Sequence, residues 1–192
     1  DEGVCILDPF AGTSTFTVRL LQSGLIKPED LARKYARELF ATEIMLLAYY
    51  VSAVNIETTY NALREEAAQR NGEPEPEYIP FSNIALADTF QIHEDGDIPD
   101  LQIFRENNET IERQKNAPIN VVIGNPPYSA GQKSANDLNA NLKYPSLDKR
   151  IAETYAAKST GTNKNSLYDS YLRAFRWATD RIGDQGLSLI HI

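Results

Sequence analysis

Short apolar runs alternate with longer segments of helical periodicity along this chain. Runs with the length and composition of buried strands occur at four places, 4–7, 40–42, 84–87 and 120–123. Helices are predicted between them over 15–22, 28–39 and 45–55, the last of which is strongly apolar. Because short apolar strands alternate with helices, we expect an α/β fold in which a mostly parallel sheet carries helices on both faces.

The remaining segments are more polar. Residues 57–77 begin as a helix and end in a Gly- and Pro-rich breaker, and residues 91–118 are charged and irregular. We interpret 91–118, like 25–39, as an insertion. Residues 129–164 predict a loop region with a short helix near 147–157. An amphipathic helix is expected over 165–182, with an apolar stripe of Leu167, Tyr171, Leu172, Phe175 and Ala178.

Polar side chains stand at the end of each predicted strand. Asp8 closes the first strand, Glu43 the second and Asp88 the third, and Asn125 follows the fourth after Gly124. In open parallel sheets, ligands bind beyond the carboxyl ends of the strands. We therefore expect these four side chains to converge on one edge of the sheet.

The loop Asp8-Pro9-Phe10-Ala11-Gly12-Thr13 leads from the first strand into a helix. Gly12 permits a close approach of backbone to ligand, and the start of the helix offers free N–H groups. The Gly-x-Gly-x-x-Gly run of dinucleotide sites is missing. An acid precedes the loop instead, which suits a cationic ligand such as the ammonium of a methionine moiety. An ordinary tight turn is the alternative interpretation.

Glu43 and Asp88 are placed where they could bind an adenosine. An acid at the end of the second strand can accept hydrogen bonds from both ribose hydroxyls. Asp88 could accept one from an adenine amino group. The alternatives are a solvated carboxylate at Glu43 and a turn or helix cap at Asp88.

The most specific motif is Asn125-Pro126-Pro127-Tyr128. Two prolines fix the backbone and remove two donors. The Asn125 amide oxygen and the Pro126 carbonyl can then both accept from one planar amino group, which frees its lone pair for an electrophile. Tyr128 offers a flat face on which the ring carrying that amine can stack. Following an apolar strand and downstream of the Asp8 loop, this motif indicates amine chemistry.

Charge is distributed unevenly along the 192 residues, whose formal net charge is −8. Residues 1–128 hold 10 Lys+Arg and 21 Asp+Glu, whereas 129–182 hold 9 Lys+Arg and 5 Asp+Glu. The basic part follows the Asn-Pro-Pro-Tyr motif, where a polyanion could be received. A solvated helix face is the alternative explanation.

Cysteine and histidine usage limits the chemistry further. Cys5 is the single cysteine, so no internal disulfide can form, and no Cys/His cluster indicates zinc. His93 and His191 lie far apart, so we expect neither a metal site nor histidine-based catalysis. No signal peptide and no apolar run long enough for a membrane helix are present, and we expect a cytoplasmic protein without a membrane partner.

These residues resemble the amino-methyltransferases of the Rossmann-like class, in the motif order of their gamma group. The resemblance implies a Rossmann-like methyltransferase fold that binds S-adenosyl-L-methionine and methylates adenine N6. It assigns the cofactor to Asp8, Phe10, Ala11, Gly12, Thr13, Glu43, Asp88 and Thr89, and the flipped base to Asn125, Pro126, Pro127 and Tyr128. Ser14 departs from the pattern, because many family members carry a second glycine there.

Residues 131–181 carry a narrower resemblance, to the methyltransferase part of type ISP restriction-modification enzymes. It rests on Gly131–Asp137, Lys143-Tyr144-Pro145, Arg150–Tyr155, Lys164–Tyr171 and Arg176-Trp177-Ala178. This resemblance implies double-stranded DNA as substrate and places 129–164 on the substrate side. It also implies nuclease, helicase and target-recognition domains in the same parent chain. We accordingly expect 1–192 to be a partial catalytic domain, incomplete at both ends.

Two alternatives remain open from the sequence. The first is a methyltransferase of protein glutamine or RNA adenine, since glutamine-modifying relatives share Asn-Pro-Pro-Tyr; the long basic segment after Tyr128 argues against the small protein modifiers. The second is a non-catalytic DNA-binding module, which Ser14 and the acidic first half leave open.

Overall fold

The strands of this chain form one parallel sheet. The computed structural model describes all residues except 1, 95–104, 128–142, 163, 184–186 and 191–192. Within the described part, five strands pair in the order β3-β2-β1-β4-β5, and every pair is parallel. The strands are β1 Cys5–Asp8, β2 Leu39–Glu43, β3 Ile84–Leu86, β4 Ile119–Gly124 and β5 Leu187–Ile190. The predicted α/β fold is confirmed.

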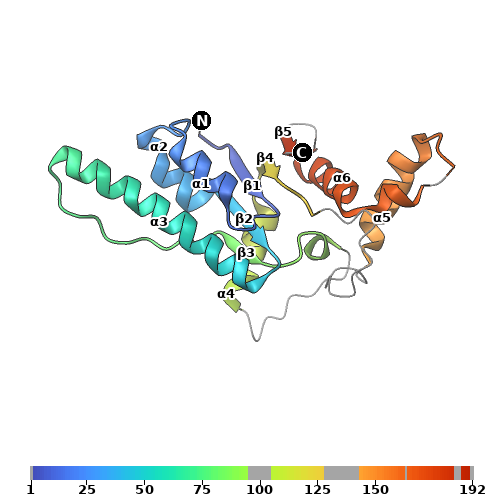
Figure 1. The fold of residues 1–192 in the computed structure, drawn as a ribbon, viewed down its shortest axis with the longest axis horizontal. Coiled ribbons are helices and arrows are strands. Elements are labelled where there is room, and N and C mark those ends of the chain that lie inside the picture. The colour runs from blue at the N-terminus through green and yellow to red at the C-terminus, as the bar shows by residue number, and fades with distance from the viewer. Residues whose placement is uncertain (1, 95–104, 128–142, 163, 184–186, 191–192) are drawn as a thin grey trace.

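The described part of the chain contains six α-helices (Figure 1). They are α1 Thr15–Gln22, α2 Pro28–Arg33, α3 Leu46–Asn71, α4 Arg105–Asn116, α5 Pro145–Ile151 and α6 Ser170–Ile182. Short π-helical turns lie at η1 Lys34–Glu38 and η3 Ala152–Ala156. Short 3₁₀-helical turns lie at η2 Gln91–His93 and η4 Asn165–Tyr168. Helix α3 packs against β2 and β3, whereas α6 packs against β4 and β5.

The two faces of the sheet bury different clusters because strand side chains alternate in direction. On β2, Leu39 and Ala41 belong to the cluster with α1 and α3, and the intervening Phe40 belongs to the other. On β1, Ile6 packs with the first cluster and Leu7 with the second. Helices therefore cover both faces, as the apolar strands predict.

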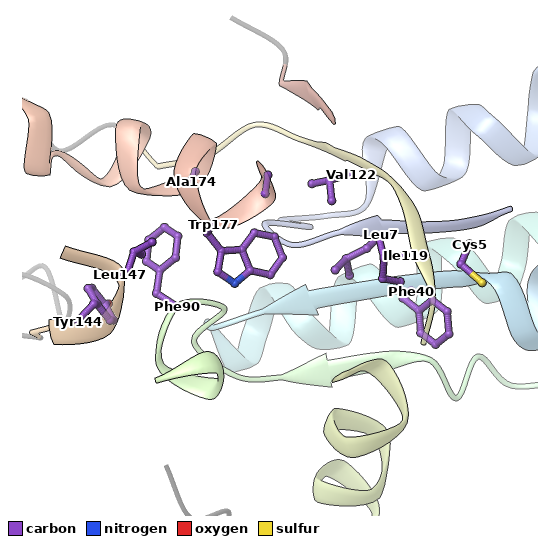
Figure 2. Packing of buried hydrophobic residues seen from close by; sticks show 11 residues of the cluster. Cys5, Leu7, Phe40, Phe90, Ile119, Val122, Tyr144, Leu147, Ala174 and Trp177 are labelled. Atoms are coloured by element: carbon purple, nitrogen blue, oxygen red, sulfur yellow. The ribbon is translucent and has the colours of Figure 1, made fainter. Parts of the chain in front are cut away.

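Trp177 of α6 is the largest side chain of the second cluster and is 5% exposed. Figure 2 shows its indole between the α6 backbone and the side chains that rise from the strands. The predicted apolar stripe of this helix was partly wrong. Tyr171, Leu172 and Phe175 are only half-buried, whereas Ala174 and Trp177 face the sheet. The predicted helix is also broken at Asp169, whose carboxylate caps α6 by accepting from the Tyr171 N–H at 2.8 Å.

We expect Trp177→Ala to lower the free energy of unfolding by about 3–5 kcal/mol, because it removes a buried aromatic side chain and leaves a cavity. Urea denaturation followed by circular dichroism measures the effect. Leu47→Ala is the control, since Leu47 is 74% exposed, and should change stability by under about 0.5 kcal/mol. Equal losses in both variants would contradict this placement of Trp177.

Two sequence-based expectations about helices need correction. The apolar segment 45–55 and the polar segment after it form the single 26-residue helix α3. Its apolar start is exposed, with Met45 at 62% and Leu47 at 74% exposure, because burial depends on which surfaces meet in space. The helix predicted over 28–39 ends at Glu38, and Leu39 already belongs to β2.

Residues 105–116 were predicted to be irregular, and this was wrong. They form α4, which packs on β3 and buries Ile111 together with Ala85 and Ile92. This helix has little apolar periodicity in its sequence, because it buries one large apolar residue together with the polar Asn108, Thr110 and Gln114. Gln114 satisfies its polarity inside the protein: it accepts from the Thr42 hydroxyl at 2.8 Å and donates to the Ala41 carbonyl at 3.1 Å.

The chain's last described strand, β5, pairs with β4 in register from Val121↔Leu187 to Gly124↔Ile190. No described helix is both long and apolar enough to cross a membrane.

Candidate functional site

The four strand-end residues gather on the carboxyl edge of the sheet. Because strands β3, β2, β1 and β4 are parallel and adjacent, Asp88, Glu43, Asp8 and Asn125 follow one another in that order. The convergence expected from the sequence is therefore observed. Its cause is topological: each parallel strand ends at the same edge, and each is followed by a polar residue.

The loop after β1 is held against the ends of its neighbours. The Gly12 N–H donates to Glu43 Oε2 at 2.8 Å, and the Ala11 N–H donates to the Thr42 carbonyl at 3.0 Å. Gly12 has φ 55°, in the region that only glycine adopts without strain. Thr89 donates its hydroxyl proton to the Pro9 carbonyl and so ties the same loop to the segment after β3.

Glu43 also fixes the start of α3. Its Oε1 accepts from the Met45 N–H at 2.8 Å, while Oε2 accepts from Gly12. Each carboxylate oxygen has two lone-pair positions, so Glu43 can still accept further hydrogen bonds from a ligand's hydroxyls.

Ser14 has a structural reason for standing where a second glycine is common. Its φ is 63°, a left-handed conformation that L-residues rarely adopt, and it is fully buried. Its hydroxyl is hydrogen-bonded to that of Ser52 on α3. This contact joins the loop to α3, the helix that follows Glu43.

Asp8 lies beneath this loop and is 1% exposed. Its Oδ1 accepts from the Phe10 N–H at 3.2 Å, and its Oδ2 is buried with no hydrogen-bond partner within the described residues. Burial raises the pKa of Asp8 to about 7, helped by the nearby negative charge of Glu43 and opposed by the Phe10 hydrogen bond. A buried carboxylate with one unsatisfied oxygen can be stabilised by a cationic group that approaches that oxygen.

Asn125 and Pro126 continue from β4 directly beside Asp8. A Cβ on Gly124 would lie 3.3 Å from Asp8 Oδ1 and 3.4 Å from Pro9 Cδ, so the glycine allows this close approach. Pro126 is buried, whereas Asn125 and Pro127 are exposed. The fourth predicted catalytic residue, Tyr128, lies outside the described residues.

The other predicted cofactor residues line the same loop. Phe10 is half-buried and packs edge-on against Phe90, with 5.5 Å between ring centroids. Ala11 is buried, and Thr13 is exposed with its carbonyl accepting from Asn55 Nδ2 at 3.0 Å.

Asp88 is half-buried, and its carboxylate accepts three hydrogen bonds from described residues. Its Oδ1 accepts from the N–H groups of Phe90 at 2.9 Å and Gln91 at 3.3 Å, and its Oδ2 accepts from the Tyr144 hydroxyl at 2.7 Å. The alternative interpretation as a turn or helix-cap residue thus describes one oxygen of Asp88. The hydroxyl contact with Tyr144, 56 residues later, could not be predicted from sequence spacing.

Glu94 is a second residue at this edge that sequence reasoning missed. Its two oxygens accept from the Ser146 N–H at 2.7 Å and the Leu147 N–H at 3.0 Å, which caps the start of α5. Pro145 is the first residue of that helix and has no N–H group, so Glu94 accepts from the next two backbone N–H groups. Glu94 and Asp88 therefore dock α5 beside the end of β3.

The basic segment is partly neutralised within the protein. Arg173 pairs with Asp148 at 2.8 Å, and Arg150 and Arg176 pair with Asp180 at 2.9 Å and 2.6 Å. The pairs of Arg173 and Arg150 join α5 to α6, whereas the Arg176 pair lies within α6. Lys143 and Lys149 are exposed, so lysines contribute more than arginines to any surface that this segment presents to a polyanion.

Among known proteins, no family model and no curated sequence matches this chain. Solved structures do match. An ATP-dependent Type ISP restriction-modification enzyme, LlaBIII bound to DNA, is 42% identical over 98% of the chain, with a TM-score of 0.85. The chain is similar to one part of a Type ISP restriction-modification enzyme.

Two further structures agree with this similarity. A nuclease-deletion mutant of the Type ISP enzyme LlaGI, in complex with a DNA substrate mimic, is 44% identical over 97% of the chain, with a TM-score of 0.83. A DrdV–DNA complex is 41% identical over 98% of the chain, with a TM-score of 0.79. The chain spans 13%, 15% and 17% of the lengths of these three proteins. The likeness to Type ISP enzymes inferred from residues 131–181 is thereby confirmed.

Proposed function

We propose that this chain transfers a methyl group from S-adenosyl-L-methionine to N6 of a flipped adenine in double-stranded DNA, within a restriction-modification enzyme. The observation that carries the proposal is the placement of Asn125 and Pro126 beside three acids on one edge of the sheet. The similarity to DNA-bound Type ISP enzymes supports DNA as the substrate.

The acids of this edge fit the cofactor's functional groups. Asp8, with one buried oxygen that no group in the described part of the chain contacts by a hydrogen bond, would hold the ammonium. Glu43 retains lone pairs for the ribose hydroxyls, and Asp88 retains one on Oδ2 for the adenine amine. Gly12 lets the backbone approach closely. The cofactor supplies an electrophilic methyl group on a sulfonium.

Asn125 and Pro126 then act on the target amine. The Asn125 amide oxygen and the Pro126 carbonyl each accept one N6 hydrogen, which draws the nitrogen lone pair out of conjugation with the ring. That lone pair forms the new N–C bond as the sulfonium C–S bond breaks. The amine afterwards loses one proton to solvent. Tyr128 would stack on the flipped base.

Methyl transfer by the full-length protein tests this function. The assay uses labelled S-adenosyl-L-methionine, duplex DNA and nucleoside analysis of the product. We expect label in N6-methyladenine. Label in protein or RNA would instead indicate a methyltransferase of protein glutamine or RNA adenine. No cofactor binding at all would favour a non-catalytic DNA-binding module.

The exposed lysines give a separate prediction about DNA. Replacing Lys133, Lys143 and Lys149 together by Gln should reduce the slope of log K against log salt, by about 0.9 for each lysine that contacts a phosphate. Lys133 lies outside the described residues. Lys27→Gln is the control, because Lys27 precedes α2 on the other side of the sheet. An unchanged slope in the triple variant would place the DNA elsewhere.

A further inference from the structure

Tyr144 joins the start of α5 to the cofactor edge. It is 3% exposed, and its hydroxyl donates to Asp88 Oδ2 at 2.7 Å. Its ring packs edge-on against Phe90, with 5.2 Å between centroids, and the Arg173 guanidinium lies 5.3 Å from the ring centroid. Figure 2 shows Tyr144 and Phe90 close together below α6.

We propose that Tyr144 is a positioning residue for recognition of the cofactor's adenine, acting through Asp88. This inference rests on the proposed function. A carboxylate alone can rotate about its last bond and present either oxygen. Here the Phe90 and Gln91 N–H groups occupy Oδ1 from one side, and the Tyr144 hydroxyl occupies one lone pair of Oδ2. The carboxylate plane is thereby fixed, and one acceptor position on Oδ2 remains for an adenine amine.

The ring of Tyr144 is held independently of its hydroxyl. Arg173 is anchored by two hydrogen bonds to Asp148, at 2.8 Å and 2.9 Å. Glu94 caps α5 through backbone N–H groups. Tyr144→Phe therefore keeps the ring contacts and the docking of α5, and removes the bond to Asp88 alone.

The test compares two ligands that differ at the recognised group. Binding of S-adenosylhomocysteine and of its deaminated analogue, S-inosylhomocysteine, is measured by calorimetry on the full-length protein. The analogue carries a carbonyl where adenine carries the amine, so Asp88 repels it. We expect the wild-type protein to prefer the adenine form by about tenfold or more, the effect of one hydrogen bond to a charged group. Tyr144→Phe should reduce that preference at least about threefold.

Tyr35→Phe is the matched control. Tyr35 is also buried and donates one hydrogen bond, to the Ile79 carbonyl at 2.9 Å, in the other core cluster. It should leave the preference unchanged. In an Asp88→Asn background, Tyr144→Phe should have no further effect on the preference.

Each other outcome overturns the inference. If Tyr144→Phe weakened both ligands equally, Tyr144 would support the fold and would not position Asp88. If its effect persisted without the Asp88 carboxylate, it would act by another route. If the wild-type protein bound neither ligand, the proposed function would fail and this inference with it.

Discussion

Asn125→Ala in the full-length protein is expected to slow N6-methyladenine formation by at least about a hundredfold, the loss typical for one preorganised hydrogen-bonding group at a reacting centre. The Asn125 amide oxygen is one of the two acceptors proposed for the target amine. Without it, the lone pair stays conjugated with the adenine ring and points away from the methyl group. The three acids of the cofactor edge are unchanged, so cofactor affinity should stay within about twofold of wild type.

Asn71→Ala provides the control for this variant. Asn71 ends α3, whose 26 residues begin just after Glu43, so it lies about 39 Å along the helix from the site. We expect its turnover to equal that of the wild-type protein. Wild-type turnover in Asn125→Ala would remove Asn125 from the mechanism. Loss of cofactor binding in that variant would indicate a disturbed sheet edge instead of a lost acceptor.

Asp8→Asn is expected to raise the stability of the protein at pH 8 and to weaken binding of the proposed cofactor. The pKa of Asp8 is raised from its ordinary value of 3.8 to about 7 in the folded protein. Between these pH values the folded state binds one more proton than the unfolded state, so stability falls as pH rises through this range. Above pH 7 the full cost of the buried charge, about 4 kcal/mol at most, is present. Asparagine has the same shape and no charge, so it removes this cost.

The expected result therefore depends on pH in a defined direction. Asp8→Asn should raise the free energy of unfolding at pH 8 by up to about 4 kcal/mol and change it little at pH 4, where Asp8 is already neutral. Urea denaturation at both pH values measures this. Asp30→Asn should show the opposite sign at pH 8, because Arg33 lowers the pKa of Asp30 and that ion pair would be lost. Equal stability changes of Asp8→Asn at both pH values would contradict the buried charge.

The same substitution should weaken the proposed cofactor. A neutral amide does not attract an ammonium group, so affinity for S-adenosyl-L-methionine should fall about tenfold or more, the contribution of one charged hydrogen bond. In the wild-type protein, the cation should lower the pKa of Asp8, and cofactor binding near pH 6 should release up to one proton. Calorimetry in buffers of different ionisation enthalpy measures that proton. Unchanged affinity in Asp8→Asn would show that another group holds the ammonium.

The short apolar runs between helical segments were sufficient to predict the sheet and the edge at which its polar strand-end residues lie. Short runs such as Cys5–Leu7 and Val121–Ile123 are buried on one face and half-buried on the other, as expected for parallel strands that helices cover on both sides. The same periodicity predicted α1 with its bounds, Thr15–Gln22. Because all strands of such a sheet end at one edge, the sequence alone also determined that Asp8, Glu43, Asp88 and Asn125 meet there.

Only the tertiary structure decided which polar contacts complete that edge and which apolar surfaces are covered. Tyr144 reaches Asp88, and Ser14 reaches Ser52, across sequence separations that no local pattern encodes. Leu47 is exposed although its segment is strongly apolar, whereas the polar Gln114 is buried because the Thr42 hydroxyl and the Ala41 carbonyl satisfy its amide. The physical reason is that the periodicity of apolar residues shows only which residues lie on the same face of a helix or strand. Burial and hydrogen bonding depend on the surface that the fold brings to that face.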